Sequence, residues 1–305
     1  QSQKLVASDR SLQAGFGSDI DLEGDVLAIG AFHESFDASG GNEQHFAGAV
    51  YIFERDASGL WSQTQKLVAS DRDAEDGFGF SVQLDGNYLV VGAHYDEDGV
   101  SGQSEAFRGG SAYIFEKQTN GLWVEQQKIT SSDRAAEDEF GFDVDIEGDV
   151  LVVSTYRQDQ NSANDSYLLD AGAVYVYNKD ASGLWSQTLK ITASDRERFD
   201  GLGRVVVLKD GYIMASAYRE NDHGSVYFFG DGSGSNWMNE EKFFPPTISD
   251  GSSFGWSISL FDDRAIIGGP GEDNNGIISV GTVFLYERDP NLGFNLPSET
   301  KSVRL

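Results

Sequence analysis

Short apolar runs, separated by glycine turns and acidic loops, recur along the whole chain. Residues 77–116 show the plan once in full: a Phe-Gly pair, a first strand, a tight Asp85-Gly86 turn, an apolar strand, an acidic loop and another apolar strand. Both apolar strands carry hydrophobic residues on either face, so each needs cover on two sides. No stretch keeps apolar residues at positions i, i+3, i+4 and i+7 over three turns. The pattern therefore predicts an all-β protein.

The plan occurs five times at a nearly constant period. Its Phe-Gly or Leu-Gly pairs are spaced 62, 62, 62 and 52 residues apart: Phe16-Gly17, Phe78-Gly79, Phe140-Gly141, Leu202-Gly203 and Phe254-Gly255. Intervals of 62, 62 and 52 residues also separate four tryptophans: Trp61, Trp123, Trp185 and Trp237. A fixed period of this size is typical of one supersecondary unit that is stacked repeatedly. We expect each unit to be a four-stranded antiparallel meander whose last strand follows the tryptophan.

The two ends of the chain indicate how the units are arranged. Residues 1–10 repeat the sequence of residues 63–72, so the chain begins inside an outer strand, while Phe294 takes the tryptophan position of the last unit. We therefore expect the N-terminal strand to complete the last unit and to close a five-bladed β-propeller, which protects most strand edges. The predicted domain spans residues 1–294, and residues 295–305 remain as a C-terminal tail or linker.

The charge balance narrows the range of partners. The chain has 50 acidic residues against 22 Lys and Arg, a formal net charge of −28, and such a surface repels nucleic acids and anionic membrane surfaces. The absence of Cys excludes disulfides, thiol nucleophiles and Cys-ligated zinc. The sequence shows no signal peptide and no apolar run long enough for membrane insertion. Because it begins at Gln1 without Met, we expect a mature or excised part of an exported protein, extracellular or at the cell surface, and one part of a larger surface protein.

The conserved plan of the units resembles the FG-GAP repeat. Phe78-Gly79 and Gly92-Ala93 carry the resemblance in one unit and Gly268-Gly269-Pro270 in the last, and it extends from about residue 14 to residue 287. FG-GAP repeats form the blades of the β-propeller of integrin α-chains and of many bacterial exported proteins, so the resemblance implies that fold and that location. Integrin-type blades often hold Ca²⁺ in a DxDxDG turn between their first two strands. The corresponding turns here, such as Asp85-Gly86, are too short for that site.

Long loops gather on one face of the predicted propeller. In an up-and-down blade the 2–3 loops and the blade-to-blade 4–1 loops emerge on the same side, and three 2–3 loops are long, at residues 32–47, 94–109 and 156–171. Loops on a rigid scaffold are the usual place for recognition, so we expect the ligand there. Side chains able to stack on sugars or to hold a carboxylate follow the second strands: Phe32, His94, Tyr95, Tyr156, Arg157, Tyr218 and Arg219. The alternative is that the aromatics plug the channel mouth and the arginines pair with neighbouring acids.

Acidic loop segments on this face are candidate Ca²⁺ sites. Ca²⁺ prefers about six to eight oxygen ligands, and alternating acids before a glycine can supply them. We expect such ligands at Asp96, Asp98, Asp273 and Asn275, although no loop has the full EF-hand spacing. Solvated polar turns are the alternative. A recurrent Ser-Asp-Arg triplet in the 4–1 loops is interpreted as scaffold, with Asp capping a turn and Arg pairing with the next blade.

No catalytic arrangement is evident from the sequence. The four His occur singly, without HExxH spacing, and no GxSxG elbow or phosphate-binding glycine loop is present. We predict a non-enzymatic binding or adhesion module that recognises a glycan or a protein, assisted by Ca²⁺. The alternatives are a carbohydrate-active enzyme, a polysaccharide lyase that uses His94, Tyr156 and Arg157 on uronate polymers, and a purely structural spacer.

Overall fold

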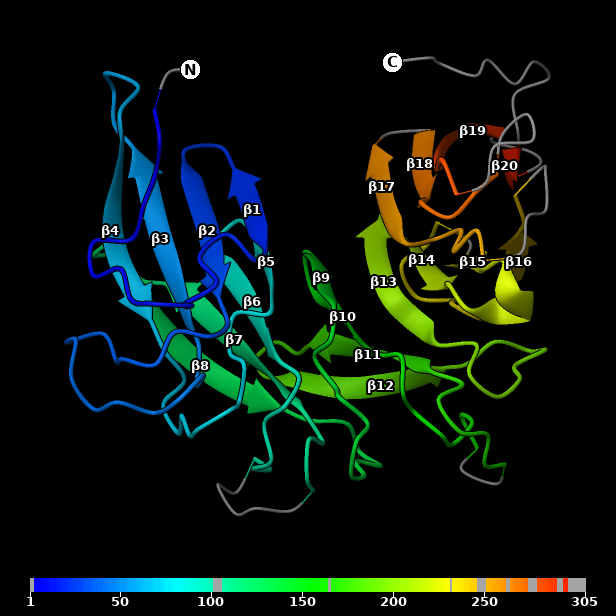
Figure 1. Ribbon diagram of the computed structural model, residues 1–305, viewed down its shortest axis with the longest axis horizontal. Helices are drawn as coiled ribbons and strands as arrows, with labels where there is room; N and C mark the ends of the chain where they lie inside the picture. The colour runs from blue at the N-terminus through cyan, green and yellow to red at the C-terminus, as the bar shows by residue number, and fades with distance from the viewer. Residues whose placement is uncertain are drawn as a thin grey trace.

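The computed structural model describes residues 3–100, 106–163, 166–230, 232–245, 251–261, 264–273, 279–289 and 293–295. Every element in these ranges is a β-strand except the 3-10 turn Glu220–Asp222. The strands form five separate four-stranded sheets, each of which is one blade (Figure 1). The predicted all-β, five-bladed propeller is confirmed. No helix in the described ranges is long and apolar enough to span a membrane.

Each blade follows the order of its strands in the chain, and neighbouring strands within a blade are antiparallel. The strands are, blade by blade, β1 (Ile20–Glu23), β2 (Val26–Ala31), β3 (Ala49–Arg55) and β4 (Trp61–Leu67); β5 (Ser81–Asp85), β6 (Tyr88–Ala93), β7 (Ser111–Lys117) and β8 (Trp123–Ile129); β9 (Val144–Glu147), β10 (Val150–Thr155), β11 (Ala173–Lys179) and β12 (Trp185–Ile191); β13 (Leu202–Lys209), β14 (Tyr212–Ala217), β15 (Ser225–Gly230) and β16 (Glu240–Phe243); β17 (Ser257–Phe261), β18 (Arg264–Gly269), β19 (Thr282–Asp289) and β20 (Gly293–Asn295).

Tight glycine turns set the register of the inner hairpins. β1 pairs with β2 from Ile20↔Ile29 to Glu23↔Val26, and the second and third blades repeat this register. The turns contain Gly24 and Gly86 at φ 58° and Gly148 at φ 62°. Glycine adopts this left-handed conformation without steric cost. Because Asp85 pairs with Tyr88, the two turn residues are Gly86 and Asn87, one position later than the predicted Asp85-Gly86 turn.

The Phe-Gly pairs join consecutive blades. The backbone of Phe78 forms a parallel bridge with Gly48 of the preceding blade, and the next two junctions repeat this bridge. A Cβ atom on Gly48 would lie 2.0 Å from the Phe78 carbonyl oxygen, and one on Gly30 would lie 2.1 Å from that of Gly79. Only glycine allows this close backbone approach. We call the two small residues of each blade that receive the next Phe-Gly pair, Gly30 and Gly48 in the first blade, the glycine seat; in the third and fourth blades serine replaces the first of the two glycines.

The hydrophobic core lies between the blades. Val50 and Ile52 of the first blade, both fully buried, belong to one apolar cluster with Phe78, Val82 and Leu89 of the second. Alternate residues of the middle strands therefore face the following blade, and the residues between them face the preceding one. Because these positions are closely packed, truncation of a buried Ile or Leu to Ala at a junction costs about 2–5 kcal/mol.

A buried polar cluster fixes each 4–1 loop to the blade that follows it. The carboxylate of Asp71 accepts hydrogen bonds from the Tyr113 hydroxyl at 2.8 Å and the Lys128 ammonium at 2.7 Å. Lys128 also lies 2.7 Å from Asp96. We call this arrangement the Tyr–Lys–Asp cluster, and the other three blades that contain it use Tyr51, Lys66 and Asp9; Tyr175, Lys190 and Asp133; and Tyr227, Lys242 and Asp195.

The arginine of the Ser-Asp-Arg triplet holds a 2–3 loop. Arg72 donates hydrogen bonds to the carbonyl oxygens of Ser35 and Asn42 at 2.9 and 2.7 Å. Arg134 binds three carbonyl oxygens of the next 2–3 loop in the same manner. The triplet is scaffold, as interpreted, but its arginine binds the blade that the chain is leaving and not the next blade.

The N-terminal segment lies beside the first blade. Gln3 exchanges two hydrogen bonds with the backbone of Trp61, at 2.7 and 3.0 Å, as Gln65 does with Trp123 across the junction of the first two blades. The segment thus takes the position of an outer strand of a preceding blade. In the fifth blade the fourth strand is β20, from Gly293–Asn295 of the chain itself. Completion of the last blade by the N-terminal strand stays a prediction.

Candidate ligand-binding face

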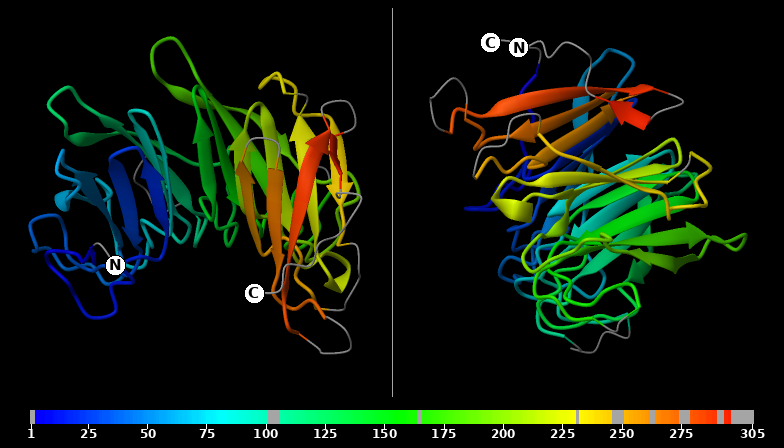
Figure 2. Two further views of the ribbon diagram at one scale, coloured as in Figure 1. Left: turned by 90° about the horizontal axis from the view of Figure 1, so that it is seen from above. Right: turned by 90° about the vertical axis from the view of Figure 1, so that its right-hand side faces the viewer.

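The inner strands of all five blades surround one axial cavity of about 550 Å³. Figures 1 and 2 show β1, β5, β9, β13 and β17 nearest to this axis and the outer strands away from it. Acidic side chains of the first three blades line the cavity together with one lysine of the fourth: Asp19, Asp21, Glu23, Asp85, Asp143, Asp145, Glu147 and Lys209.

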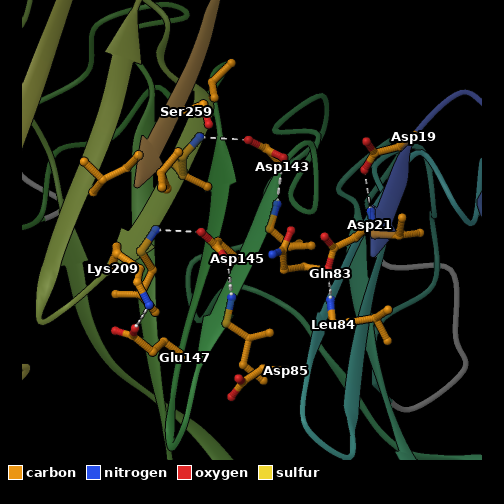
Figure 3. A pocket seen from close by; sticks show the side chains of 18 of the residues that line it. Asp19, Asp21, Gln83, Leu84, Asp85, Asp143, Asp145, Glu147, Lys209 and Ser259 are labelled. Atoms are coloured by element: carbon orange, nitrogen blue, oxygen red, sulfur yellow. Dashed lines mark hydrogen bonds and ion pairs between the residues drawn. The ribbon is translucent and has the colours of Figure 1, made fainter. Parts of the chain in front are cut away.

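All of these carboxylates except Glu147, which pairs with the Lys209 side chain, accept hydrogen bonds from the backbone of the following blade (Figure 3). Asp143 and Asp145 accept hydrogen bonds from the N–H groups of Val206 and Leu208 at 2.8 and 2.7 Å. Asp19, directly before β1, and Asp21 in β1 bind β5 in the same way. Each carboxylate thereby satisfies a donor on the free edge of an inner strand. Burial raises the pKa of Asp143 to about 7 and the pKa of Asp145 to about 8. The acidic lining therefore belongs to the scaffold.

Aromatic side chains close the loop-face end of the axis. The ring centroid of Phe80 lies 5.3 Å from Phe32, 3.9 Å from His94 and 5.0 Å from Phe142, and Phe142 lies 4.4 Å from Tyr156. His94 is buried, and this burial lowers its pKa to about 3, so that its ring is uncharged at neutral pH. His94 cannot meet a ligand at the surface, because it belongs to an aromatic plug of the kind that the alternative interpretation describes.

The plug continues on the fourth and fifth blades with different chemistry. Arg204 stands where the second and third blades have Phe80 and Phe142. Its guanidinium carbon lies 3.8 Å from the ring centroid of Trp256 and 5.0 Å from that of Tyr218. Tyr218 is buried, whereas Trp256 is 44% exposed and presents part of its ring to solvent. The plug is thus more open to solvent at the fifth blade, at Trp256.

Tyr95, Arg157 and Arg219 directly follow His94, Tyr156 and Tyr218 in the chain, and they lie around the plug on the loop face. The Arg108 guanidinium carbon lies 4.4 Å from the Tyr95 ring centroid. Arg157 forms ion pairs with Glu139 at 2.8 Å and with an exposed neighbouring glutamate at 3.1 Å. Arg219 is exposed and stacks on Tyr218 at 4.9 Å. The alternative of pairing with acids thus holds for Arg157, whereas Arg219 forms no ion pair with a described residue.

Four arginines on the loop face have no ion pair among the described residues. Each stacks on an aromatic ring instead, whereas most other Lys and Arg side chains in the described ranges bind a carboxylate or a loop carbonyl. We call these pairs the arginine rim: Arg108 on Tyr95, Arg198 on Phe199, Arg204 on Trp256 and Arg219 on Tyr218. In a chain with a net charge of −28, stacked cations that form no ion pair with a described residue are available to an external anion.

The described members of the predicted Ca²⁺ ligand set have other partners. Asp96 is buried in a Tyr–Lys–Asp cluster, where the ammonium group of Lys128 occupies the place expected for the cation, so Asp96 is a scaffold residue. Asp98 is half-buried and donates its N–H to Asp96. Asp273 caps its own loop, and Asn275 lies outside the described residues. Within the described ranges no group of three or more His, Cys, Asp or Glu is arranged to hold a metal ion.

Sequence reasoning missed three of the four rim arginines. Arg204 and Trp256 stand directly after the glycine of the repeated pair, where the second and third units have phenylalanine. This departure from the repeated phenylalanine could have identified both residues from the sequence. Arg108 and Arg198 lie in loops without periodicity, and no sequence signal distinguished them from arginines that bind acids.

Comparison with known proteins agrees with this architecture. The model of the FG-GAP repeat family matches residues 1–53, 61–115, 123–177, 185–229 and 237–286. The fold is similar to that in the crystal structure of a protein from Lactobacillus plantarum, with a TM-score of 0.55 and 13% sequence identity over 92% of this chain and 69% of that one. No curated protein matches the sequence. Five matches in register cover most of the chain, which therefore belongs to the FG-GAP repeat family.

Proposed function

We propose that the protein is a non-enzymatic, extracellular binding module that holds a carboxylate-bearing glycan on the arginine rim. The observation that carries this proposal is the set of four arginines that stack on aromatic rings without an ion pair in the described ranges. A guanidinium group binds a carboxylate through two parallel hydrogen bonds, and stacking holds it in place beforehand. The half-exposed Trp256 ring adds an apolar surface for the face of a sugar.

The scaffold supports this use of the loop face. The arginines of the Ser-Asp-Arg triplets bind the carbonyl oxygens of the 2–3 loops, so the loops next to the rim are held before a ligand arrives. Such preorganisation reduces the ordering cost of binding. The burial of His94 removes the proposed base from the surface and favours binding over the lyase alternative.

The net charge has a consequence for the affinity. A protein with a charge of −28 repels a polyanion at long range, so the attraction acts only at contact distance. One charged hydrogen-bonded contact contributes about 1.5–3 kcal/mol. Loss of one rim arginine should therefore weaken binding roughly 10-fold or more, since about 1.4 kcal/mol corresponds to a factor of 10.

Calorimetric titration with oligogalacturonate, and with a neutral glucan of equal length, tests the proposal. We expect the acidic oligosaccharide to bind, Arg219→Ala to weaken it roughly 10-fold or more, and Arg55→Ala to leave it unchanged. Arg55 is the matched control because it is an arginine at the opposite end of the blades, paired with Asp25. Equal binding of both oligosaccharides, or equal effects of the two variants, contradicts the proposal. Formation of an unsaturated sugar product contradicts the non-enzymatic part, and loss of binding in a chelator shows that Ca²⁺ takes part.

A further inference from the structure

The fifth blade exposes the face that the other blades bury. Val283 and Leu285 on β19 are 69% and 44% exposed, whereas their counterparts in the fourth blade, Val226 and Phe228, are 0% and 4% exposed. Ile266 on β18 is 48% exposed, and its fourth-blade counterpart is 1% exposed. In the first four blades these positions form the apolar contact with the next blade. The fifth blade therefore keeps a complete junction surface that the described residues leave uncovered.

The glycine seat of the fifth blade, Gly268 and Gly281, also has no Phe-Gly pair of a following blade packed against it among the described residues. A Cβ atom on Gly224 of the fourth blade would lie 2.3 Å from the carbonyl oxygen of Phe254 in the next blade. On the corresponding Gly281 it would first meet Pro270 of the same blade, at 3.2 Å, and on Gly268 its nearest neighbour would be the side chain of Ser257 in the same blade. The fifth blade has small residues where a following Phe-Gly backbone would approach, and no described residue uses that space.

The first blade does not cover this surface. Ile20 and Leu22 on β1 are 62% and 57% exposed, whereas the corresponding Val82 and Leu84 on β5 are 2% and 5% exposed. If the first and fifth blades packed together, both sets of side chains would be buried. The two blades stand apart in two views, with the blue first blade and the orange fifth blade on opposite sides of the axis (Figures 1 and 2).

We propose that the exposed face of the fifth blade binds a further FG-GAP blade. The four junctions within the chain establish the chemistry of this interface: an apolar face, a glycine seat, and an incoming Phe-Gly pair followed by a strand with alternating apolar residues. The fifth blade presents the receiving half of the same interface. Its occupant is therefore a sixth blade of this repeat type, whose Phe-Gly pair enters the seat at Gly268 and Gly281 and whose inner strand covers Ile266 and Val283.

Two aspartate variants test whether the face is open in the natural chain. Val283→Asp should leave the unfolding temperature unchanged, because the side chain already meets solvent. Val174→Asp at the corresponding, fully buried position of the third blade should lower it strongly. Equal destabilisation by both variants overturns the proposal, since it shows that the first blade already covers the face. A dimer in analytical ultracentrifugation that Val283→Asp dissociates also overturns it, in favour of a second copy of the chain.

A sixth blade can be supplied from the chain's own sequence. A copy of residues 63–131 joined after Asn295 provides the outer strand of the fifth blade and a complete following blade. We expect this extended monomer to have a higher unfolding temperature and to bind less apolar dye than the natural chain. The same extension with Val283→Asp is the matched control and should lose both gains. An extended chain that folds but shows neither gain overturns the proposal.

Discussion

Lys128→Met should destabilise the second blade because it removes the cation that neutralises two carboxylates. The ammonium group of Lys128 lies 2.7 Å from both Asp71 and Asp96, and the Asp96 side chain is 2% exposed. Burial by itself lowers the pKa of Lys128, but Asp96 and Asp71 raise it above its usual value, so the lysine is charged at neutral pH. Methionine leaves Asp96 as a buried carboxylate without a counter-ion. Breaking a buried pair in this way costs about 3–5 kcal/mol.

The third blade supplies the matched control for this prediction. Lys190 contacts Asp133 at 2.5 Å, but the neutral Gln158 stands in the position of Asp96. Lys190→Met therefore leaves one partly exposed carboxylate, and we expect a loss of about 1.5–3 kcal/mol, the range for a hydrogen bond to a charged group. Urea titrations at neutral pH give the free energy of unfolding of both variants. Equal losses in the two blades would refute the reasoning from the buried Asp96 charge.

Three further outcomes are expected. Burial raises the pKa of Asp76 and of Asp145 to about 8, whereas in the unfolded chain both groups titrate near 3.8. Between these pH values the unfolded state therefore binds fewer protons than the folded state, and the unfolding temperature should fall as the pH rises from about 5 to about 8. A rise in the unfolding temperature would contradict this. Gly110→Val places a Cβ 2.1 Å from a backbone oxygen of the next blade and should abolish the calorimetric unfolding peak. The control Gly86→Ala, at φ 58° in open space, should cost only about 1–2 kcal/mol of stability. Similar losses in the two variants would show that the glycine seat is not a steric requirement. Arg134→Ala should speed hydrogen exchange in the 2–3 loop of the second blade with little change in global stability, and unchanged exchange would mean that other contacts hold the loop.

The fold could be predicted because each of its determinants repeats along the sequence. The Phe-Gly pair and the Asp85-Gly86 type of turn recur where only glycine fits, so steric necessity and sequence period coincide. The Tyr–Lys–Asp cluster also recurs at the repeat period, as in Tyr113, Lys128 and Asp71, and its three members could have been identified by aligning the units. Closure could not be read in the same way, because it depends on the angle between blades, which no single residue determines.

The candidate site was harder to predict from the sequence than the fold, because it depends on the direction of side chains in loops. The sequence places His94 and Tyr95 next to each other, but only the structure shows that the first is buried in the plug and the second is on the rim. Arg157 and Arg219 occupy equivalent positions, yet only Arg157 meets carboxylates. Asp96 has the sequence context of a metal ligand, and its actual partner, Lys128, is 32 residues away (128 − 96). Pairing of this kind is decided in three dimensions.

The contacts at each junction have a direction, and this direction bears on how the protein is made. The Phe-Gly pair of the second blade packs on Gly48, and N–H groups of its inner strand donate hydrogen bonds to Asp19 and Asp21. All three of these residues precede the second blade in the chain. A ribosome releases the residues in the same order, so every emerging blade meets a predecessor that is already able to fold. Nascent chains that stop at a blade boundary should therefore be native-like arrays with one apolar end and not collapsed intermediates. We therefore expect the blades to fold in chain order during synthesis, each against the surface of the finished blade before it.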